Sequence, residues 1–395
     1  MTLSTPTTEA TNTWEGTSVD VASIDKALGR LWKDLGRAEV SDGRRPPART
    51  SVFNLVVYVP HASGTAPVVE AIGGLIEQHP SRTIVVVADP DAPSSSLDAV
   101  VTTNCTPSRS VRERFCWEQI TLTAHGDSAA HAPGIVIPLL LPDLPTYLWW
   151  ADDVPFGSEL FARMAGLCDR VIVDSARLTL PIDGLTKLAA LSRATGEDRG
   201  ISDFHWVRLT PWRNLAAQLF DKAESCPYLT RIESVGITYA RDGGQRSVTQ
   251  ALLLAGWLAS CLGWSPRPQG ARLQGDTLHL EAERGGGAIV SIEIAPDTKT
   301  GVAKGDVLSL TLAGALRDVP AVFAVERLPE DSEAATTTTI GGAPGVSHRV
   351  RMVARSASEL LNEELEVFRH DRIYENAINA VAALCERVAA EEQSP

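Results

Sequence analysis

Two apolar runs near the N-terminus constrain the fold of this chain more than any other feature. "SVFNLVVYV" at 51–59 and "RTIVVVAD" at 82–89 are almost continuously hydrophobic. Strands with this pattern are covered on both faces, as in a parallel sheet flanked by helices. The stretch between them, 66–79, has the pattern of a helix that ends at Pro80. Strand, helix and strand in this order predict an α/β unit with a mostly parallel sheet.

The same alternation continues along the first part of the chain. A helix ahead of the first strand is marked by an apolar stripe at helical spacing, Ile24, Leu28, Leu31 and Leu35. Further strands are expected at 116–124, 145–150 and 170–175, with a helix at 157–167. The first part of the chain is therefore predicted to be a mostly parallel sheet with flanking helices.

The pattern changes near residue 240. The apolar helix expected at 251–264 is shorter than the ~20 residues of a bilayer span, and Gly263 is placed to end it. Short alternating strands follow, and "SASE" at 356–359 is a capping box that opens one of two closing helices. The chain is thus predicted to contain a disordered tail over 1–20, an α/β domain over 21–240 and an α+β domain with an antiparallel sheet over 241–395.

The charge of the chain limits its partners. The formal net charge is −13, so its surface repels phosphate backbones and anionic lipid. Binding to nucleic acid or to a membrane surface is not expected. The N-terminal "MTLSTPTTEATNTWEGTS" lacks the basic start and apolar core of a signal peptide, which predicts a cytoplasmic protein.

Six cysteines are scattered without a CxxC pair or the spacing of zinc ligands. Cys261 and Cys385 fall on apolar helical positions and are expected in the core. Cys105 and Cys116 flank the polar segment "TPSRSVRERF" and are the expected site of any redox switch. A hairpin across this segment could bring their Cα atoms within the ~7 Å that a disulfide needs.

The usual nucleotide and nucleophile motifs, GxGxxG, GxxxxGK[ST] and GxSxG, do not occur, so no cofactor is expected. "ADPDAP" places Asp89 and Asp91 just beyond a buried strand. The pair resembles the metal-binding DxD of nucleotide-sugar transferases, although Asp before Pro is also an ordinary turn former. A metal-dependent sugar-nucleotide enzyme that uses these two aspartates therefore remains an alternative.

"LPDLPTYLWWADD" at 141–153 carries two tryptophans, Trp149 and Trp150, and two carboxylates, Asp152 and Asp153. Adjacent carboxylates rarely face one substrate, so a solvated turn fits them better than acid–base catalysis. Large aromatics in a strand are usually core, and of two neighbours one points to each face of the sheet.

A second cluster lies in "ISDFHWVRLTPWRNLAAQLFD" at 201–221, which carries Trp206, Arg208, Trp212 and Arg213. Trp and Arg are the residues most enriched among interface hot spots. Both clusters are therefore predicted to lie at or just under a partner-binding surface.

Five segments in order, "NLVVYV", "LLLPDLPTYLWWADDVPFG", "DRVIVDS", "DFHWVRLTPWRNLAAQLFD" and "ALLLAGWLASCLGW", resemble the glucose-6-phosphate dehydrogenase assembly protein family. The resemblance runs from about residue 20 to 390. It implies a non-catalytic subunit that binds the dehydrogenase, promotes its active oligomer and raises its activity in the oxidative pentose phosphate pathway. In cyanobacteria it also implies a link to thioredoxin, without assigning that link to particular cysteines.

Overall fold

The computed structural model describes the greater part of the chain as two compact units. Unit 1 comprises residues 1–173, 198–200 and 356–369, and unit 2 comprises residues 174–197, 201–355 and 370–395. The described residues are 9–41, 48–49, 51–61, 64–75, 79–107, 114–241, 247–298, 302–328, 333–345, 347–366 and 370–392.

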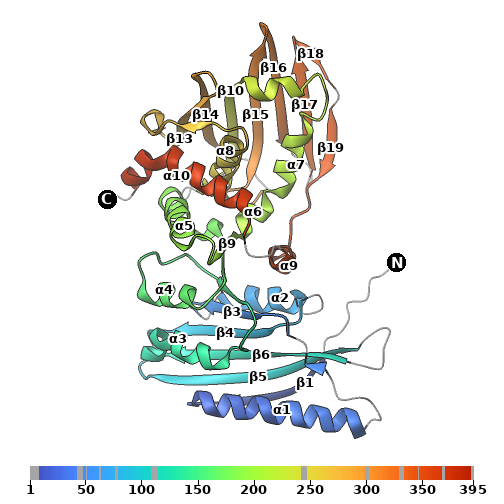
Figure 1. The fold of residues 1–395 in the computed structure, drawn as a ribbon, viewed down its shortest axis with the longest axis vertical. Coiled ribbons are helices and arrows are strands. Elements are labelled where there is room, and N and C mark those ends of the chain that lie inside the picture. The colour runs from blue at the N-terminus through green and yellow to red at the C-terminus, as the bar shows by residue number, and fades with distance from the viewer. Residues whose placement is uncertain are drawn as a thin grey trace. The chain divides into compact units, whose positions relative to one another are not determined.

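Unit 1 is built on a mixed sheet with a parallel centre (Figure 1). Its strands are β1 (Glu9–Gly16), β2 (Ala48–Arg49), β3 (Asn54–Val59), β4 (Arg82–Asp89), β5 (Ser96–Pro107), β6 (Arg114–His125), β7 (Thr146–Trp150) and β8 (Arg170–Val173). Apart from β2, which pairs in parallel with β6, these strands lie in the order β1-β5-β6-β4-β3-β7-β8. The strands from β6 to β8 are parallel, and β5 and β1 are antiparallel to their neighbours. All of β3 and β4 up to Ala88 is buried, as the two apolar runs predict.

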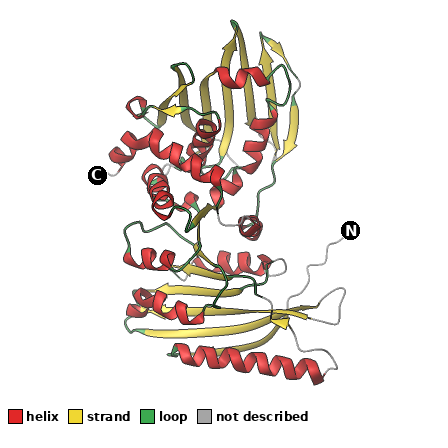
Figure 2. Ribbon diagram, viewed as in Figure 1, coloured by secondary structure: helices red, strands yellow, loops and turns green. Residues whose placement is uncertain are grey.

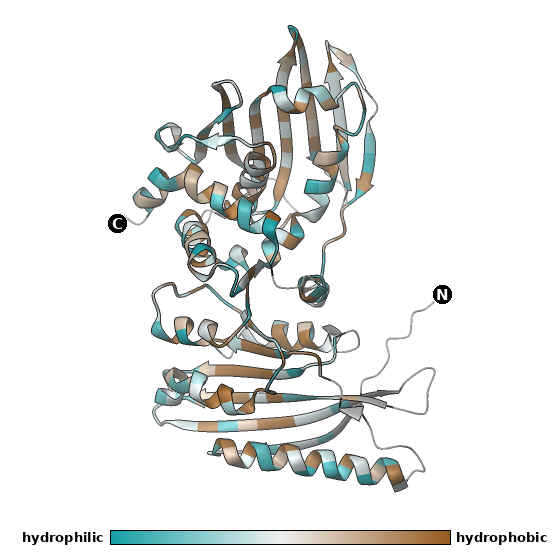
Figure 3. Cartoon of the chain, in the orientation of Figure 1, coloured by the Kyte–Doolittle hydropathy of each residue, from teal (hydrophilic) through white to brown (hydrophobic). Residues whose placement is uncertain are grey.

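The helices of unit 1 are α1 (Val21–Ser41), α2 (Thr65–Leu75), α3 (Ala132–Val136), α4 (Glu159–Gly166) and α9 (Ala357–Glu366). The predicted stripe of α1 is confirmed, because all four of its apolar residues are buried. Figure 3 shows the resulting alternation of hydrophobic and hydrophilic bands along this helix. The capping box before α9 is also formed, since the Ser356 N–H donates to Glu359 Oε2 at 2.7 Å and the Glu359 N–H to Ser356 Oγ at 3.3 Å.

Residues 9–16 form strand β1, although the sequence predicts a disordered tail over 1–20. β1 runs antiparallel to β5, with Trp14 opposite Val101. The segment is rich in Thr, which is a good strand former, and β5 offers it an open edge with unpaired backbone groups. An available edge, which the composition of the segment does not reveal, accounts for the difference.

Unit 2 is built on a second, mainly antiparallel sheet (Figure 1). Its strands are β10 (Ile232–Ala240), β11 (Ser265–Pro266), β12 (Arg272–Gln274), β13 (Thr277–Arg284), β14 (Ala288–Asp297), β15 (Val307–Leu316), β16 (Val319–Arg327), β17 (Glu333–Ile340), β18 (Ala343–Pro344) and β19 (His348–Arg351). The order is β11-β13-β14-β10-β15-β16-β17-β18. Among the described strands of unit 2, only β10 and β14 pair in parallel.

The helices of unit 2 are α5 (Pro181–Thr195), α6 (Phe204–Arg208), α7 (Thr210–Gln218), α8 (Thr249–Cys261) and α10 (Arg372–Glu392). α10 packs against both α5 and α8, and Figure 2 shows these helices grouped together beside the sheet. Gly256 allows the closest approach, because a Cβ there would overlap the backbone oxygen of Ala377. The short strand β9 (Gly200–Asp203) lies where the chain passes from one unit to the other.

The division of the chain differs from the sequence-predicted boundary at residue 240. β10 precedes that boundary but is a central strand of unit 2, and α9 follows it but belongs to unit 1. Strand pairing joins residues far apart in the sequence, so a change in local pattern does not mark where a unit ends.

The predicted fold class is confirmed: a mostly parallel α/β sheet is combined with a largely antiparallel α+β sheet. Within the described ranges, no helix is long and apolar enough to cross a bilayer.

Candidate functional site

Trp149 and Trp150 lie on β7 and are part of the core of unit 1, with only 6% and 2% of their surfaces exposed. The Trp150 ring stacks on Tyr58 with centroids 4.3 Å apart and meets Phe161 edge-on at 5.1 Å. Its indole N–H donates to the backbone oxygen of Asp153 at 3.0 Å. These tryptophans are therefore internal supports of unit 1 and do not form an exposed aromatic surface.

Asp152 and Asp153 follow β7 in a local turn. The Asp153 N–H donates to Asp152 Oδ1 at 2.9 Å. Both residues are half-buried. This hydrogen bond ties the Asp152 carboxylate to the backbone of the next residue, as in a local turn.

Asp89 is engaged by a histidine rather than by Asp91. The His125 ring lies between two carboxylates, with Nδ1 3.1 Å from Asp89 Oδ2 and Nε2 3.3 Å from Asp98 Oδ2. Asp89 and His125 end the parallel strands β4 and β6 and are paired in register. No group of three or more potential metal ligands occurs among the residues that the structure describes.

Cys105 and Cys116 form a disulfide between β5 and β6, where they face each other in register with Cα atoms 4.2 Å apart. The predicted proximity is confirmed, but both cysteines are buried although the segment between them is polar. Their exposures are 5% and 1%, because Trp32 and Leu35 of α1 pack over them. The pair is thus a buried cross-link under a helix.

Cys261 and Cys385 are both predicted to lie in the core, but only Cys385 does. Cys385 is buried as expected, and burial raises the pKa of its thiol to about 12. Cys261 is exposed, because α8 ends at this residue and Gly263 follows with φ +64°. The apolar run predicted the helix correctly but not that its last turn reaches the surface.

The second Trp/Arg cluster belongs to unit 2, and its aromatic members are also internal. Trp206 and Trp212 are 2% and 1% exposed. The Arg213 guanidinium lies 3.5 Å from the centre of the Trp206 ring, and the Trp206 indole N–H donates to Asp371 Oδ2 at 2.7 Å. The two arginines of this cluster are half-buried, whereas its tryptophans lie in the core.

Arg208 joins the cluster to a buried network of charges. Its guanidinium binds Asp174 with two bonds of 2.7 and 2.9 Å. Burial would raise the pKa of Asp174, but this bidentate pairing outweighs burial and holds the pKa below its ordinary value. The same pairing raises the pKa of Arg208 against the effect of burial.

Asp203 and His205 are the innermost members of the network. Asp203 Oδ1 accepts hydrogen bonds from the N–H groups of Ser175 and His205, both at 2.9 Å, and the Tyr374 hydroxyl donates to Oδ2 at 3.3 Å. Burial raises the pKa of Asp203 to about 6, and burial lowers the pKa of His205 to about 4. His205 Nδ1 lies 2.8 Å from Thr249 Oγ1 on α8. Burial is the main cause of both pKa shifts.

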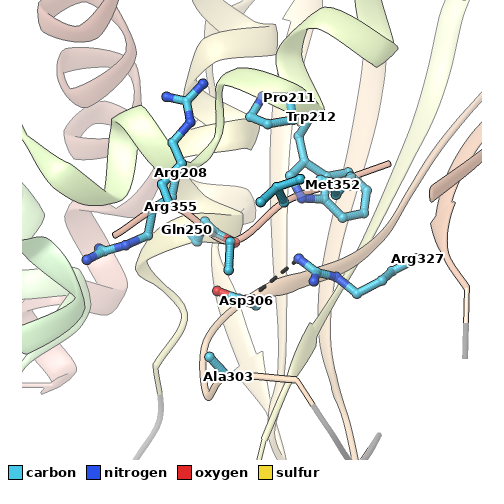
Figure 4. Close-up of a pocket in the computed structure, with 11 residues that line it drawn as sticks. Arg208, Pro211, Trp212, Gln250, Ala303, Asp306, Arg327, Met352 and Arg355 are labelled. Atoms are coloured by element: carbon cyan, nitrogen blue, oxygen red, sulfur yellow. Dashed lines mark ion pairs between the residues drawn. The ribbon is translucent and has the colours of Figure 1, made fainter. Parts of the chain in front are cut away.

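A pocket of about 250 Å³ opens beside this network, entirely within unit 2 (Figure 4). Its walls come from the end of α6, the start of α7, α8, the segment just before β15, the end of β16 and the segment after β19. The lining residues are Arg208, Pro211, Trp212, Gln250, Ala303, Asp306, Arg327, Met352, Val353, Ala354 and Arg355. The sequence indicates Arg208 and Trp212 but not the others, because they are spread over distant segments without a local motif.

One ion pair sits inside the pocket. Arg327 lies 3.5 Å from Asp306, and their side chains are 18% and 23% exposed. Burial raises the pKa of Asp306, and the positive charges of Arg327 and Arg208 oppose that rise. Figure 4 shows the Arg327 guanidinium directed at Asp306, near Gln250 and Met352, whereas those of Arg208 and Arg355 point outward from the rim.

Two family models match the chain in succession. The glucose-6-phosphate dehydrogenase subunit N-terminal domain matches residues 74–190, and the C-terminal domain of the same subunit matches residues 199–378.

Curated relatives agree with these matches. A protein of Synechocystis sp. named "Putative OxPP cycle protein OpcA" is 27% identical over 291 residues, which cover 68% of this chain and 56% of the relative. The protein of that name in Synechococcus elongatus is 28% identical over 277 residues, 68% of this chain and 59% of the relative. The chain therefore spans just over half the length of these relatives.

Among solved structures, an oxidoreductase domain protein from Kribbella flavida is 10% identical, with a TM-score of 0.43 over 87% of this chain and 98% of that chain. This likeness is too distant to bear on function. The two successive family matches together cover well over half of the sequence, and the chain belongs to the glucose-6-phosphate dehydrogenase subunit family, whose curated relatives are named OpcA.

Proposed function

We propose that this chain is a non-catalytic subunit of glucose-6-phosphate dehydrogenase, which promotes the active oligomer of that enzyme and raises its activity. The observation that carries the proposal is the match, in order, to both domains of the dehydrogenase subunit family.

The physical basis of activation is differential affinity. A subunit shifts the dehydrogenase toward its active form only if it binds that form more tightly than the inactive one. A tenfold shift requires about 1.4 kcal/mol of difference between the two binding free energies. That energy is within the reach of a few well-placed contacts.

The decisive measurement is the initial rate of the dehydrogenase from the same cell, at increasing glucose 6-phosphate, with and without this chain. A lower apparent KM or a higher kcat, together with co-elution of the two proteins in gel filtration, supports the proposal. Superimposable rate curves at a saturating amount of the chain refute it.

The docking surface proposed here is polar, because the four candidate tryptophans are internal. Asp152 and Asp153 in unit 1 and Arg208 and Arg213 in unit 2 are half-buried and retain accessible atoms. Arg213→Ala is the preferred variant, since Arg208 is tied to a buried partner. Arg267→Ala is the matched control, because Arg267 is an arginine of the same unit whose side chain is 46% exposed. Equal pull-down of the dehydrogenase by both folded variants would place the contact elsewhere.

The Cys105–Cys116 disulfide is the proposed site of redox control by a thioredoxin-like reductant. Because both sulfur atoms lie under α1, reduction requires this helix to move locally. Differential thiol labelling after oxidation and after reduction, read by mass spectrometry, follows the pair directly. If activation of the dehydrogenase responds to the reductant while both cysteines stay bonded, the control lies on another cysteine or on the dehydrogenase.

A further inference from the structure

We infer that the pocket of unit 2 binds a small polyhydroxylated anion, of the chemical class of sugar phosphates and sugar acids. The inference concerns the isolated chain and does not depend on its action on the dehydrogenase. It rests on the donors and acceptors inside the pocket, the charges around it and its size.

The first observation is a buried amide aimed into the pocket. Gln250 is only 2% exposed, and its Oε1 accepts the Val307 N–H at 2.7 Å. This bond fixes the orientation of the amide, so the NH2 group faces the pocket and has no hydrogen-bond partner within the described part of the chain. The amide nitrogen is accessible from the pocket, so it can donate a hydrogen bond to an oxygen atom of a ligand.

The second observation is the ion pair beside this amide. The 3.5 Å between Arg327 and Asp306 is longer than the 2.7–2.9 Å usual for a direct charged hydrogen bond. Both residues line the pocket. The carboxylate of Asp306 accepts protons from hydroxyl groups, whereas the guanidinium of Arg327 and the amide of Gln250 donate to oxygen atoms. A ligand with hydroxyl groups and an anionic oxygen matches this set of groups.

The third observation is the charge of the lining. Three arginines, Arg208, Arg327 and Arg355, line the pocket together with one aspartate, Asp306, in a chain whose net charge is −13. Asp174 balances Arg208, and the arginines at the rim direct their charged groups outward. The guanidinium directed into the pocket is that of Arg327, so an anionic oxygen of the ligand would be oriented toward it.

The fourth observation is shape. Trp212, Pro211 and Met352 form an apolar wall that suits the C–H face of a sugar ring. The volume of about 250 Å³ lies below the ~300–1,000 Å³ of pockets that hold drug-sized ligands. A single ring with one anionic group fits this space better than a nucleotide does.

Binding is measured by titration calorimetry of the full chain with four probes. Glucose 6-phosphate and gluconate carry hydroxyl groups with a phosphate or a carboxylate, glucose is the neutral control, and inorganic phosphate is the control for charge alone. We expect at least one of the two hydroxylated anions to bind at least tenfold more tightly than glucose and phosphate. The stronger of the two identifies the anionic group that the pocket prefers.

Arg327→Gln tests the assignment to this pocket, and Arg284→Gln is its matched control. Arg284 is a similarly buried arginine of unit 2, 12% exposed and 3.7 Å from Glu233, and it does not line the pocket. The first variant is expected to weaken binding at least tenfold and the second to leave it unchanged. Circular dichroism checks that both variants fold.

If Arg327→Gln does not fold, hydrogen exchange of the wild-type chain decides. Added ligand should slow exchange in residues 352–355 and at the start of α7. The inference is refuted if none of the probes binds, if phosphate alone binds as well as the hydroxylated anions, if both variants lose binding equally, or if the protected amides lie outside the pocket walls. Loss of dehydrogenase binding in Arg327→Gln without any binding of the probes would also refute it, in favour of an acidic segment of the partner.

Discussion

Asp203 and His205 should make nearly equal and opposite contributions to the pH dependence of stability. The folded-state pKa of Asp203 is raised from 3.8 to about 6, so its ionisation lowers stability as the pH rises between these values. The folded-state pKa of His205 is lowered from 6.5 to about 4, so stability is gained as the pH rises over that range. Each shift of about 2 units or slightly more is worth about 3 kcal/mol, and the two effects offset each other.

Asp203→Asn removes the ionisable group that lowers stability as the pH rises. The asparagine oxygen can still accept from the N–H groups of Ser175 and His205, so the start of α6 keeps its cap. The variant should be more stable than the wild type at pH 7 by up to about 3 kcal/mol. Its free energy of unfolding should rise by about 3 kcal/mol between about pH 4 and pH 6.5, because His205 now acts alone.

Equilibrium urea unfolding at several pH values measures this difference, and hydrogen exchange of peptides from α8 assigns it to unit 2. Asp221→Asn, at an exposed position of the same unit, is the control and should follow the wild type. If Asp203→Asn has a pH profile parallel to that of the wild type, or is less stable at pH 7, the balance between the two buried groups does not exist.

Three further changes test the packing and the cross-link inside each unit, taken separately. Trp212→Ala should lower the free energy of unfolding of unit 2 by about 3–5 kcal/mol, since the ring is fully buried, and urea unfolding measures the loss. Gly256→Ala should lower the free energy of unfolding by about 1–3 kcal/mol, because its Cβ would overlap the backbone oxygen of Ala377. An unchanged melting temperature would show that α8 and α10 can move apart to accept the methyl group. Reducing the Cys105–Cys116 bond, whose cysteines are 11 residues apart, should cost about 3 kcal/mol; equal urea midpoints with and without reductant would contradict this.

The local elements of this chain could be predicted from the sequence, because each is encoded by a short pattern. The apolar runs mark β3 and β4, the stripe after Ser23 marks α1, and Gly263 marks the end of α8. Burial on both faces, amphipathic spacing and capping each act over a few residues, so the pattern and the structure agree.

Sheet membership and the pocket could not be predicted, because both depend on residues far apart in the chain. β10 precedes the predicted boundary at residue 240, but its partners β14 and β15 come later in the chain. Arg208 and Arg327 meet in one pocket only after α6 and β16 are in place. The sequence predicts both tryptophan clusters at or just under a contact surface, yet all four of their tryptophans are buried in the core.

The path of the chain between the two units has a consequence for synthesis on the ribosome. Unit 1 needs residues 356–369, which emerge only after the segment 201–355 of unit 2 has been made, and α9 from this stretch packs on α2. Unit 1 therefore lacks α9 while most of unit 2 is being translated. A nascent chain that stalls before α9 exposes the apolar face of α2 to chaperones, and neither unit can be moved to another gene as one contiguous piece.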